Sequence, residues 1–221
     1  MMSKHHGTST IEIERKYDVA EDARRPAFVG VGPIAVIEAP EVRELDAVYY
    51  DTEDFRLANA NIALRRREGG PDAGWHIKRD LEEGRLEQHW PLAEGEDDGT
   101  EHGARGRASV PAALLKELGD LVQRDLLMPV ARVRNHRVVS RLLDAAGYPV
   151  AEYCDDHVVG ENLITGHSES WREWEVELSA AAPDSRRGRA ELFEGLEVVV
   201  RDAGGTPSAS TSKLERALRA G

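Results

Sequence analysis

The sequence predicts a single α+β domain built on a closed or strongly curved antiparallel sheet, and three observations favour this fold. Several segments alternate in side-chain character or are rich in β-forming residues, with Gly, Pro or Asp at their ends. Few segments favour helices, and neither a repeat nor a clear linker divides the 221 residues. Many antiparallel strands with few helices are typical of sheets that curve strongly or close on themselves.

The expected strands follow one another along most of the chain. They cover approximately residues 11–18, 43–51, 61–68, 74–79, 85–91, 130–141, 148–158 and 171–179. The segment 51–61, which joins the second strand to the third, is expected to form a loop with a short helical turn.

Helices are expected where polar caps precede apolar periodic stretches. Ser109 supplies an N-cap and Pro111 a first-turn proline for a helix that continues to about residue 122. Two further helices are expected at 184–204 and 211–220. Two stretches lack any pattern, so we expect residues 1–9 to form a flexible N-terminus and the acidic, Gly-rich residues 92–109 a mobile surface loop.

Composition excludes several classes of protein. The net charge of −12 argues against a general nucleic-acid-binding surface, which needs clustered basic residues. No apolar run approaches the ~18 residues that cross a bilayer, and the N-terminal segment has no signal-peptide core. Cys154 is the only cysteine, which excludes an internal disulfide and fits a reducing cytoplasm. We therefore expect a cytoplasmic monomer or homodimer without nucleic-acid or membrane partners.

Ionisable residues recur at every second position of the expected strands, opposite an apolar face. In order along the chain they are Glu12, Glu14 and Lys16; Arg65 and Arg67; His76 and Lys78; Arg85, Glu87 and His89; Arg132 and Arg134; and Glu173, Glu175 and Glu177. Any one of these rows is ordinary for a half-buried strand with a solvated face. Together they sort by chemistry, because carboxylate pairs occupy the first and last strands and basic residues the strands between.

This sorting indicates a site for an anion and a metal ion. Clustered carboxylates repel one another unless cations lie among them, and hard divalent ions prefer such oxygen ligands. Arginine holds phosphate oxygens in a bidentate fork, and lysine holds them as a point charge. A carboxylate pole beside a cationic pole therefore suits a polyphosphate chain with its metal ion.

The ordered motifs resemble those of the CYTH domains, part of the triphosphate tunnel metalloenzyme superfamily. EIERKY resembles the Glu-x-Glu-x-Lys signature that opens these domains, and YYDTEDFRLANANIALRRRE resembles their Tyr-Asp-Thr segment and Leu-Arg-x-Arg strand. WHIKRD, RLEQHWPL and RVRNHR are similar to their lysine, Arg-x-Glu and second arginine strands. CDDHV, EWEVEL and SKLERAL are similar to their acidic, second Glu-x-Glu and C-terminal Ser-Lys motifs. Each motif alone is a weak signal, but the ordered set covers nearly the whole chain.

The resemblance implies an eight-stranded antiparallel β-barrel or tunnel with helices packed outside. It also implies a metal-dependent triphosphatase that uses Mg²⁺ or Mn²⁺ and acts on inorganic, nucleoside or thiamine triphosphate. The metal ligands that it implies are Glu12, Glu14, Asp156, Glu175 and Glu177, with Asp155 as the alternative to Asp156. The phosphate-binding residues that it implies are Lys16, Arg65, Arg67, Lys78, Arg134 and Lys213, with Arg132, Arg85 and Glu87 as further candidates. Spacing alone would make Lys213 an exposed residue of a terminal helix, so only the resemblance assigns it to the tunnel.

Phosphoryl transfer requires positioning and charge neutralisation more than covalent chemistry. We expect Glu177 to act on the attacking water and Lys16 to stabilise the charge that develops on the phosphates, so both are candidate catalytic residues. Two alternatives remain open: a class IV-type adenylate cyclase that makes cyclic AMP from ATP, and a polyphosphate-binding module without turnover. No sequence feature marks a pocket for adenine, which favours the triphosphatase.

Overall fold

The computed structural model describes residues 7–92, 110–122 and 126–219. Its strands coincide closely with the expected ones, although β8 and β9 are longer than predicted and the single strand predicted at 11–18 is divided at Ile13 into β1 and β2. The longer strands are β1 (Thr8–Glu12), β2 (Glu14–Asp18), β4 (Glu41–Asp51), β5 (Ile62–Glu68), β6 (Gly74–Asp80), β7 (Arg85–Pro91), β8 (Met128–Leu143), β9 (Pro149–Asn162) and β10 (Ser168–Leu178). Two-residue strands, β3 (Val36–Ile37) and β11 (Thr206–Pro207), pair at the margins.

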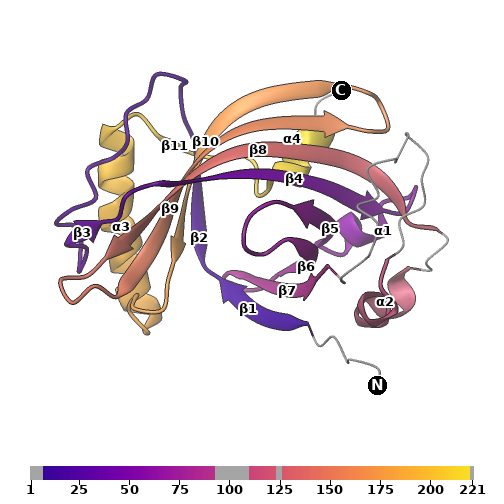
Figure 1. The fold of residues 1–221 in the computed structure, drawn as a ribbon, viewed down its shortest axis with the longest axis horizontal. Coiled ribbons are helices and arrows are strands. Elements are labelled where there is room, and N and C mark those ends of the chain that lie inside the picture. Colours follow the sequence, from indigo (N-terminus) through magenta and orange to yellow (C-terminus); the bar gives the residue numbers. More distant parts are fainter. Residues whose placement is uncertain (1–6, 93–109, 123–125, 220–221) are drawn as a thin grey trace.

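All strands pair in one antiparallel sheet, in the order β1-β7-β6-β5-β4-β8-β9-β10-β2 (Figure 1). No pairing among the described residues closes the sheet between β1 and β2. These two strands are consecutive in the sequence and are separated only by Ile13, so the two ends of this strand order lie next to each other. The sheet therefore wraps around an inner face, and the space that this face bounds is called the tunnel below. The predicted α+β fold with a curved antiparallel sheet is confirmed.

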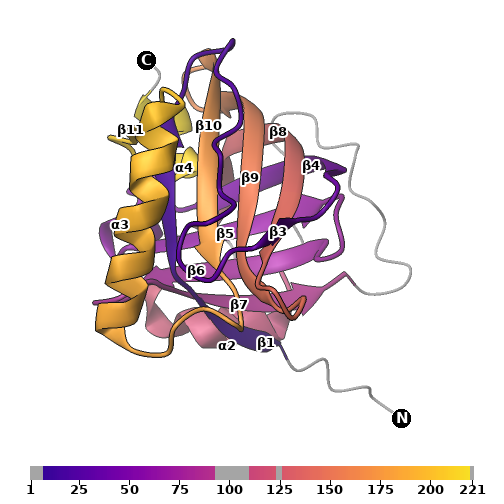
Figure 2. The ribbon, with the colours of Figure 1, turned by 90° about the vertical axis from the view of Figure 1, so that its left-hand side faces the viewer.

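Helix α3 (Arg186–Asp202) covers the outer face of the sheet at β2, β9 and β10 (Figure 2). The side chain of Ser185 caps its first turn by accepting a hydrogen bond from the Gly188 amide at 3.0 Å. Leu196 of this helix is fully buried against a cluster that includes Trp174 and Val176 of β10. The apolar face of the last long strand is thus turned outward, under a helix.

A second outer layer lies over β5, β6 and β7. Helix α2 (Ala112–Leu118), followed by a short 3-10 turn (Gly119–Leu121), buries Leu114 and Leu118 against Trp75 and other apolar residues of these strands. Pro111 directly precedes the helix, whereas the predicted cap Ser109 lies outside the described residues. The predicted helical turn is α1 (Arg56–Asn59), whose Leu57 and Ala58 amides donate to the Asp51 carboxylate.

Helix α4 (Lys213–Arg219) differs from α2 and α3, because it packs against the inner face. Leu214 and Ala217 contact an apolar cluster that contains Val133 of β8 and Val158 of β9. Part of the inner face is therefore apolar, and that part supports a helix instead of charges. The packing of α4 on this face determines which residues of β8 point into the tunnel.

The ends of the chain depart slightly from expectation. β1 begins at Thr8, which pairs with His89 of β7, so the residues predicted to be flexible as far as position 9 are partly in a strand. β-Branched Thr8 and Thr10 favour this pairing. The loop predicted at 92–109 lies almost entirely outside the described residues. None of the described helices is long and apolar enough to span a membrane.

Candidate functional site

The register of the sheet places most of the predicted site residues on its inner face, because residues directly opposed on neighbouring strands share a face. The opposed pairs are Glu12 and Arg85, Lys78 and Glu87, Arg65 and His76, Arg137 and Asp156, Glu175 and Lys16, and Glu177 and Glu14. One row of ionisable groups therefore runs around the tunnel, from β1 across the sheet to β2.

A pocket of about 420 Å³ opens where the β1 and β2 ends of this row meet. Its lining combines two carboxylates and a lysine of β1 and β2 with hydroxyl groups from the segment before α4. The lining residues are Glu12, Glu14, Lys16, Asp80, Leu81, Gly84, Arg85, Ser208, Ser210 and Thr211. We call this pocket the mouth of the tunnel.

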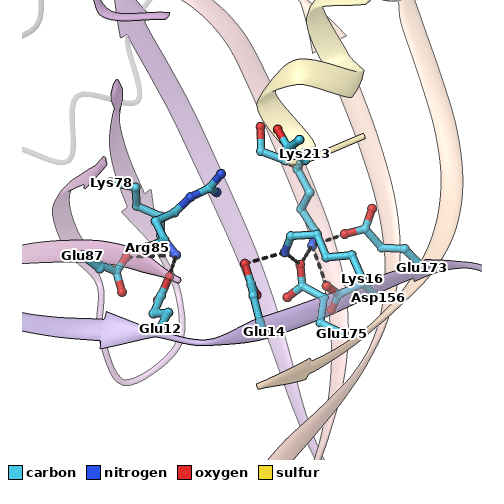
Figure 3. A network of polar contacts seen from close by, with 12 residues as sticks. Glu12, Glu14, Lys16, Lys78, Arg85, Glu87, Asp156, Glu173, Glu175 and Lys213 are labelled. Atoms are coloured by element: carbon cyan, nitrogen blue, oxygen red, sulfur yellow. Dashed lines mark hydrogen bonds and ion pairs between the residues drawn. The ribbon is translucent and has the colours of Figure 1, made fainter. Parts of the chain in front are cut away.

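The deep cluster consists of Asp156, Glu173 and Glu175 with the cations Lys16 and Lys213 (Figure 3) and with Arg137. Nζ of Lys213 lies 2.8 Å from Asp156 Oδ2, 2.5 Å from Glu173 Oε1 and 2.7 Å from Glu175 Oε1. Arg137 forms a bidentate pair with Asp156 at 2.7 and 2.6 Å and also contacts Glu175. Lys16 contacts Glu175. Three carboxylates thus face three cations, so the formal charge of the deep cluster is balanced.

The pKa values of the deep cluster reflect this pairing. Burial alone would raise the pKa of the Glu175 carboxyl, but the charges of Lys16 and Lys213 hold it well below its usual range. The pKa of Asp156 is lowered in the same way: Arg137 and Lys213 outweigh the effect of burial. These side chains are therefore ionised at neutral pH.

The mouth cluster consists of Glu12, Glu14 and Glu177. Glu12 pairs with Lys78 at 2.6 Å and Glu14 with Lys16 at 3.0 Å, whereas Glu177 forms no ion pair within the described part of the chain (Figure 3 shows the first two). Burial, followed by the charges of Glu12 and Glu14, raises the pKa of Glu177 to about 8. Burial also raises the pKa of Glu12 to about 7, although Lys78 opposes it. When all three carboxyls are ionised, the mouth cluster has more negative charge than Lys16 and Lys78 neutralise, so without a bound cation Glu177 is largely protonated at neutral pH.

Two arginines of β5 line the opposite wall of the tunnel. Arg65 Nη2 lies 3.2 Å from Glu87 Oε1, and Arg67 forms an ion pair with Asp72. The buried Nε atoms of both arginines have no hydrogen-bond acceptor among the described residues. Burial, reinforced by the charge of Arg65, lowers the pKa of Arg67 to about 10. A guanidinium group has five N–H donors, and Arg65 places one of them on Glu87, which leaves others for an additional anion.

The prediction that Arg132 and Arg134 face the tunnel is wrong. Both are exposed and lie on the other face of β8, where Arg132 pairs with Asp46 at 2.6 Å and Arg134 approaches Glu161 at 3.5 Å. The error came from assigning Val133 to the outer face. Val133 faces inward because α4 packs on the inner face there.

Arg137 occupies the inward position that the sequence analysis missed. The sequence contains one indication of this position: Arg137 lies four residues after Val133, so both side chains are on the same face of β8, whereas Arg134 is on the other face. Glu173 was also not predicted as a site residue, although it lies two residues before Glu175 on the same face of β10 and is only 3% exposed. The choice between neighbouring aspartates is clear, since Asp156 faces the deep cluster while Asp155 pairs with Arg172 on the outer face.

The family model for the CYTH domain matches residues 10–199. The chain belongs to the CYTH domain family. An uncharacterised protein found in two strains of Mycobacterium tuberculosis is 36% identical over 223 aligned positions, which cover 95% of this chain. The alignment covers 40% of that protein, so this chain spans about two fifths of the length of the curated relatives that it matches.

Two solved structures share the fold of this CYTH domain. A candidate adenylate cyclase from Bacillus halodurans superposes with a TM-score of 0.61 at 19% identity, over 94% of this chain and 97% of that one. A candidate adenylyl cyclase from Hippeastrum, described as having a dominant triphosphatase activity, gives a TM-score of 0.55 at 17% identity, over 95% of each chain. At these identities the comparison shows the fold alone.

The carboxylates of this CYTH domain fit a hard divalent cation. Oxygen atoms of Asp156, Glu173 and Glu175 lie within 4.8 Å of one another, the one such group found among the described residues. The mouth cluster adds carboxylates with uncompensated charge, as the raised pKa of Glu177 indicates. Oxygen-only donors suit hard divalent cations better than softer metals.

Proposed function

We propose that this CYTH domain is a metal-dependent triphosphatase that hydrolyses inorganic triphosphate or another triphosphate. The observation that carries this proposal is the separation of charge across the tunnel. Glu177 at the mouth has no ion-pair partner among the described residues, and Arg65, whose Nε has no acceptor among them, lies on the wall across from the mouth. Arg67, further along the same strand, is already paired with Asp72. A phosphate chain that carries a metal ion at one end is complementary to both poles.

Metal binding would involve Glu12, Glu14, Asp156, Glu175 and Glu177. A bound Mg²⁺ or Mn²⁺ would supply charge neutralisation on the phosphate oxygens and would lower the pKa of a coordinated water. The mouth cluster has the charge to receive it. Asp156 and Glu175, which already pair with lysine and arginine side chains, would contribute ligand oxygens from the deep cluster.

The other side chains have separate roles. Glu177, which lies directly opposite Glu14 at the mouth, would accept the proton of the attacking water. Lys16, with Arg65 and Lys78 across the tunnel, would stabilise the charge on the transferred and leaving phosphates. Arg137 and Lys213 keep the deep cluster ionised and extend the cationic surface. Burial raises the pKa of the Cys154 thiol well above its usual value, which argues against a covalent cysteinyl intermediate.

The experiment that tests this function compares substrates and identifies products. Phosphate release and cyclic AMP formation are measured with inorganic triphosphate, ATP and thiamine triphosphate, each with Mg²⁺ and with Mn²⁺. A tunnel that recognises phosphates should hydrolyse inorganic triphosphate at least as well as ATP. The matched control is Arg134→Ala, which removes an arginine from the outer face of the same sheet.

The same assay separates the alternatives. An adenylate cyclase would convert ATP to cyclic AMP and leave inorganic triphosphate untouched, because the attacking group is the ribose hydroxyl of its own substrate. A polyphosphate-binding module would bind these compounds and release nothing. Formation of cyclic AMP without phosphate release from inorganic triphosphate would replace our proposal with the cyclase.

A further inference from the structure

Arg67 differs from the other inward cations in the origin of its partner. Arg65 and Lys78 pair with Glu87, a residue of the sheet itself. The partner of Arg67 is instead Asp72, which lies in the turn between β5 and β6. The side chain of Arg67 is 8% exposed and that of Asp72 is 46% exposed, so a surface carboxylate reaches in to a buried guanidinium.

Lys78, Arg65 and Arg67 form a row of cations along β5 and β6, called the cationic row below, and Arg67 lies at its far end from the mouth. Lys78 is directly opposite Ala63 of β5 and contacts Glu12 of the mouth cluster. Arg65 lies two residues further along β5 and Arg67 four, which places Arg67 about 13 Å beyond the mouth at ~3.3 Å per residue. A phosphate chain anchored at the mouth cluster therefore meets Lys78 and Arg65 before it meets Arg67.

The turn that carries Asp72 is fixed in place. Gly69 has a φ of +76°, and a Cβ atom there would lie 1.9 Å from the Glu44 carbonyl oxygen, so the turn approaches β4 too closely for any other residue. The carbonyl oxygen of Asp72 lies 3.0 Å from His76 Nε2. These contacts hold the Asp72 carboxylate over Arg67.

We propose that Asp72 sets the length of the phosphate chain that the tunnel accepts, an inference that rests on the proposed function. The carboxylate occupies the position on Arg67 that the next phosphate of a longer chain would take. A longer chain has to displace Asp72 and also meets its negative charge. Asp72 is thus a positioning residue that ends the cationic row one arginine early and favours triphosphate over tetraphosphate.

The test measures equilibrium binding and turnover of inorganic triphosphate and inorganic tetraphosphate by the wild-type chain and by Asp72→Asn. Asn keeps the volume and the backbone contact to His76 but removes the charge. We expect the Kd and KM for tetraphosphate to fall by on the order of tenfold, the scale of one charge-assisted contact. The values for triphosphate should change by less than about threefold, and kcat should stay unchanged for both.

Four further variants make the result specific to the proposed role. In an Arg67→Gln background, Asp72→Asn should have no additional effect on chain-length preference. Asp72→Glu should keep the wild-type preference. Glu68→Gln is the matched control, because it breaks the Arg66–Glu68 pair on the outer face of the same strand. It should change the Kd and KM of neither substrate. Asp72→Ser serves as a second charge-removing variant if Asp72→Asn does not fold.

Equal gains for both substrates, or no gain in any charge-removing variant, would overturn the inference while leaving the proposed function in place. Failure of the wild-type chain to bind triphosphate at all would instead overturn the proposed function, and the inference with it.

Discussion

The deep cluster and the mouth cluster each combine three carboxyl groups with nearby cations, yet their charge is balanced differently. Asp156, Glu173 and Glu175 face three cations, and the pKa values of Asp156 and Glu175 are lowered. At the mouth, Glu177 has no ion-pair partner among the described residues, and its pKa is raised to about 8. The balanced cluster holds β9, β10 and α4 together, whereas the unbalanced cluster is the part that a ligand would complete.

The largest effect is expected from breaking the deep cluster. Asp156→Asn removes a fully buried carboxylate that holds Arg137 and Lys213, and it leaves both cations under-compensated. The free energy of unfolding should fall by about 3–5 kcal/mol, measured by thermal or chemical denaturation. Asp155→Asn is the matched control on the outer face. Its partner Arg172 keeps the Ala20 and Glu21 carbonyl acceptors, so we expect a loss of about 1 kcal/mol. Equal losses would remove the distinction between the two faces.

A smaller effect is expected on the cationic wall, where the loss should appear in catalysis. Arg65→Ala should lower kcat/KM for inorganic triphosphate and ATP by a similar factor of roughly 30, equivalent to about 2 kcal/mol. Glu87 keeps contacts with Lys78 and His76 in this variant, so the fold should remain intact. Steady-state kinetics with circular dichroism as a folding control would measure this. Unchanged kcat/KM would exclude Arg65 from the phosphate site.

The mouth cluster should show its imbalance as a pH dependence of stability. Glu177 binds its proton more tightly in the folded chain, with a pKa of about 8, than in the unfolded chain, where glutamate has a pKa of about 4.5. Its contribution is present at low pH and is lost as pH rises toward 8, because the unfolded chain has then released the proton that the folded chain still holds. Between pH 6.5 and 8 the metal-free wild-type chain should therefore lose about 2 kcal/mol relative to Glu177→Gln.

Melting temperatures of both chains across this pH range, in the presence of a chelator, provide the measurement. A difference between the two chains that is constant with pH would show that Glu177 has an ordinary pKa. Adding Mg²⁺ or Mn²⁺ should reduce the loss in the wild-type chain, because a bound cation stabilises the ionised carboxylate.

The smallest effect is expected on the outer face of β8. Arg134→Ala removes a half-exposed side chain 3.5 Å from Glu161, a contact worth at most about 0.5 kcal/mol. Activity on any triphosphate should stay within about twofold of wild type. Arg137→Ala, three residues further along the same strand, should impair both stability and activity. A large effect of Arg134→Ala on activity would restore the original prediction that this residue faces the tunnel.

Strand periodicity predicted most of the fold, because β2, β5, β6, β7 and β10 each place ionisable residues on one face and mainly apolar residues on the other. The inward positions of Glu12, Glu14, Lys16, Arg65, Arg67, Lys78, Glu175 and Glu177 follow from that alternation. The rule failed at β8, where α4 packs inside the sheet and makes Val133 an inward residue. Which helix enters the tunnel is a tertiary property, so neither periodicity nor local propensity could reveal Arg137.

The ion pairs themselves were also beyond the sequence. Lys213 contacts residues 38 to 57 positions earlier in the chain, and the charge balance of the deep cluster depends on this contact. Spacing along the terminal helix treats Lys213 as a surface residue. Only the three-dimensional arrangement distinguishes a neutralised carboxylate from one that is available to a metal ion.

The central claim is that the mouth cluster binds a metal ion that triphosphate hydrolysis requires. The most direct measurement is the rate of phosphate release from inorganic triphosphate as a function of Mg²⁺ or Mn²⁺ concentration, for the wild-type chain and for Glu14→Gln. We predict that the wild-type rate falls to background in a chelator, and that Glu14→Gln lowers it by at least about a hundredfold while the chain stays folded. Wild-type rates in Glu14→Gln at limiting metal, or full activity in the chelator, would contradict the account.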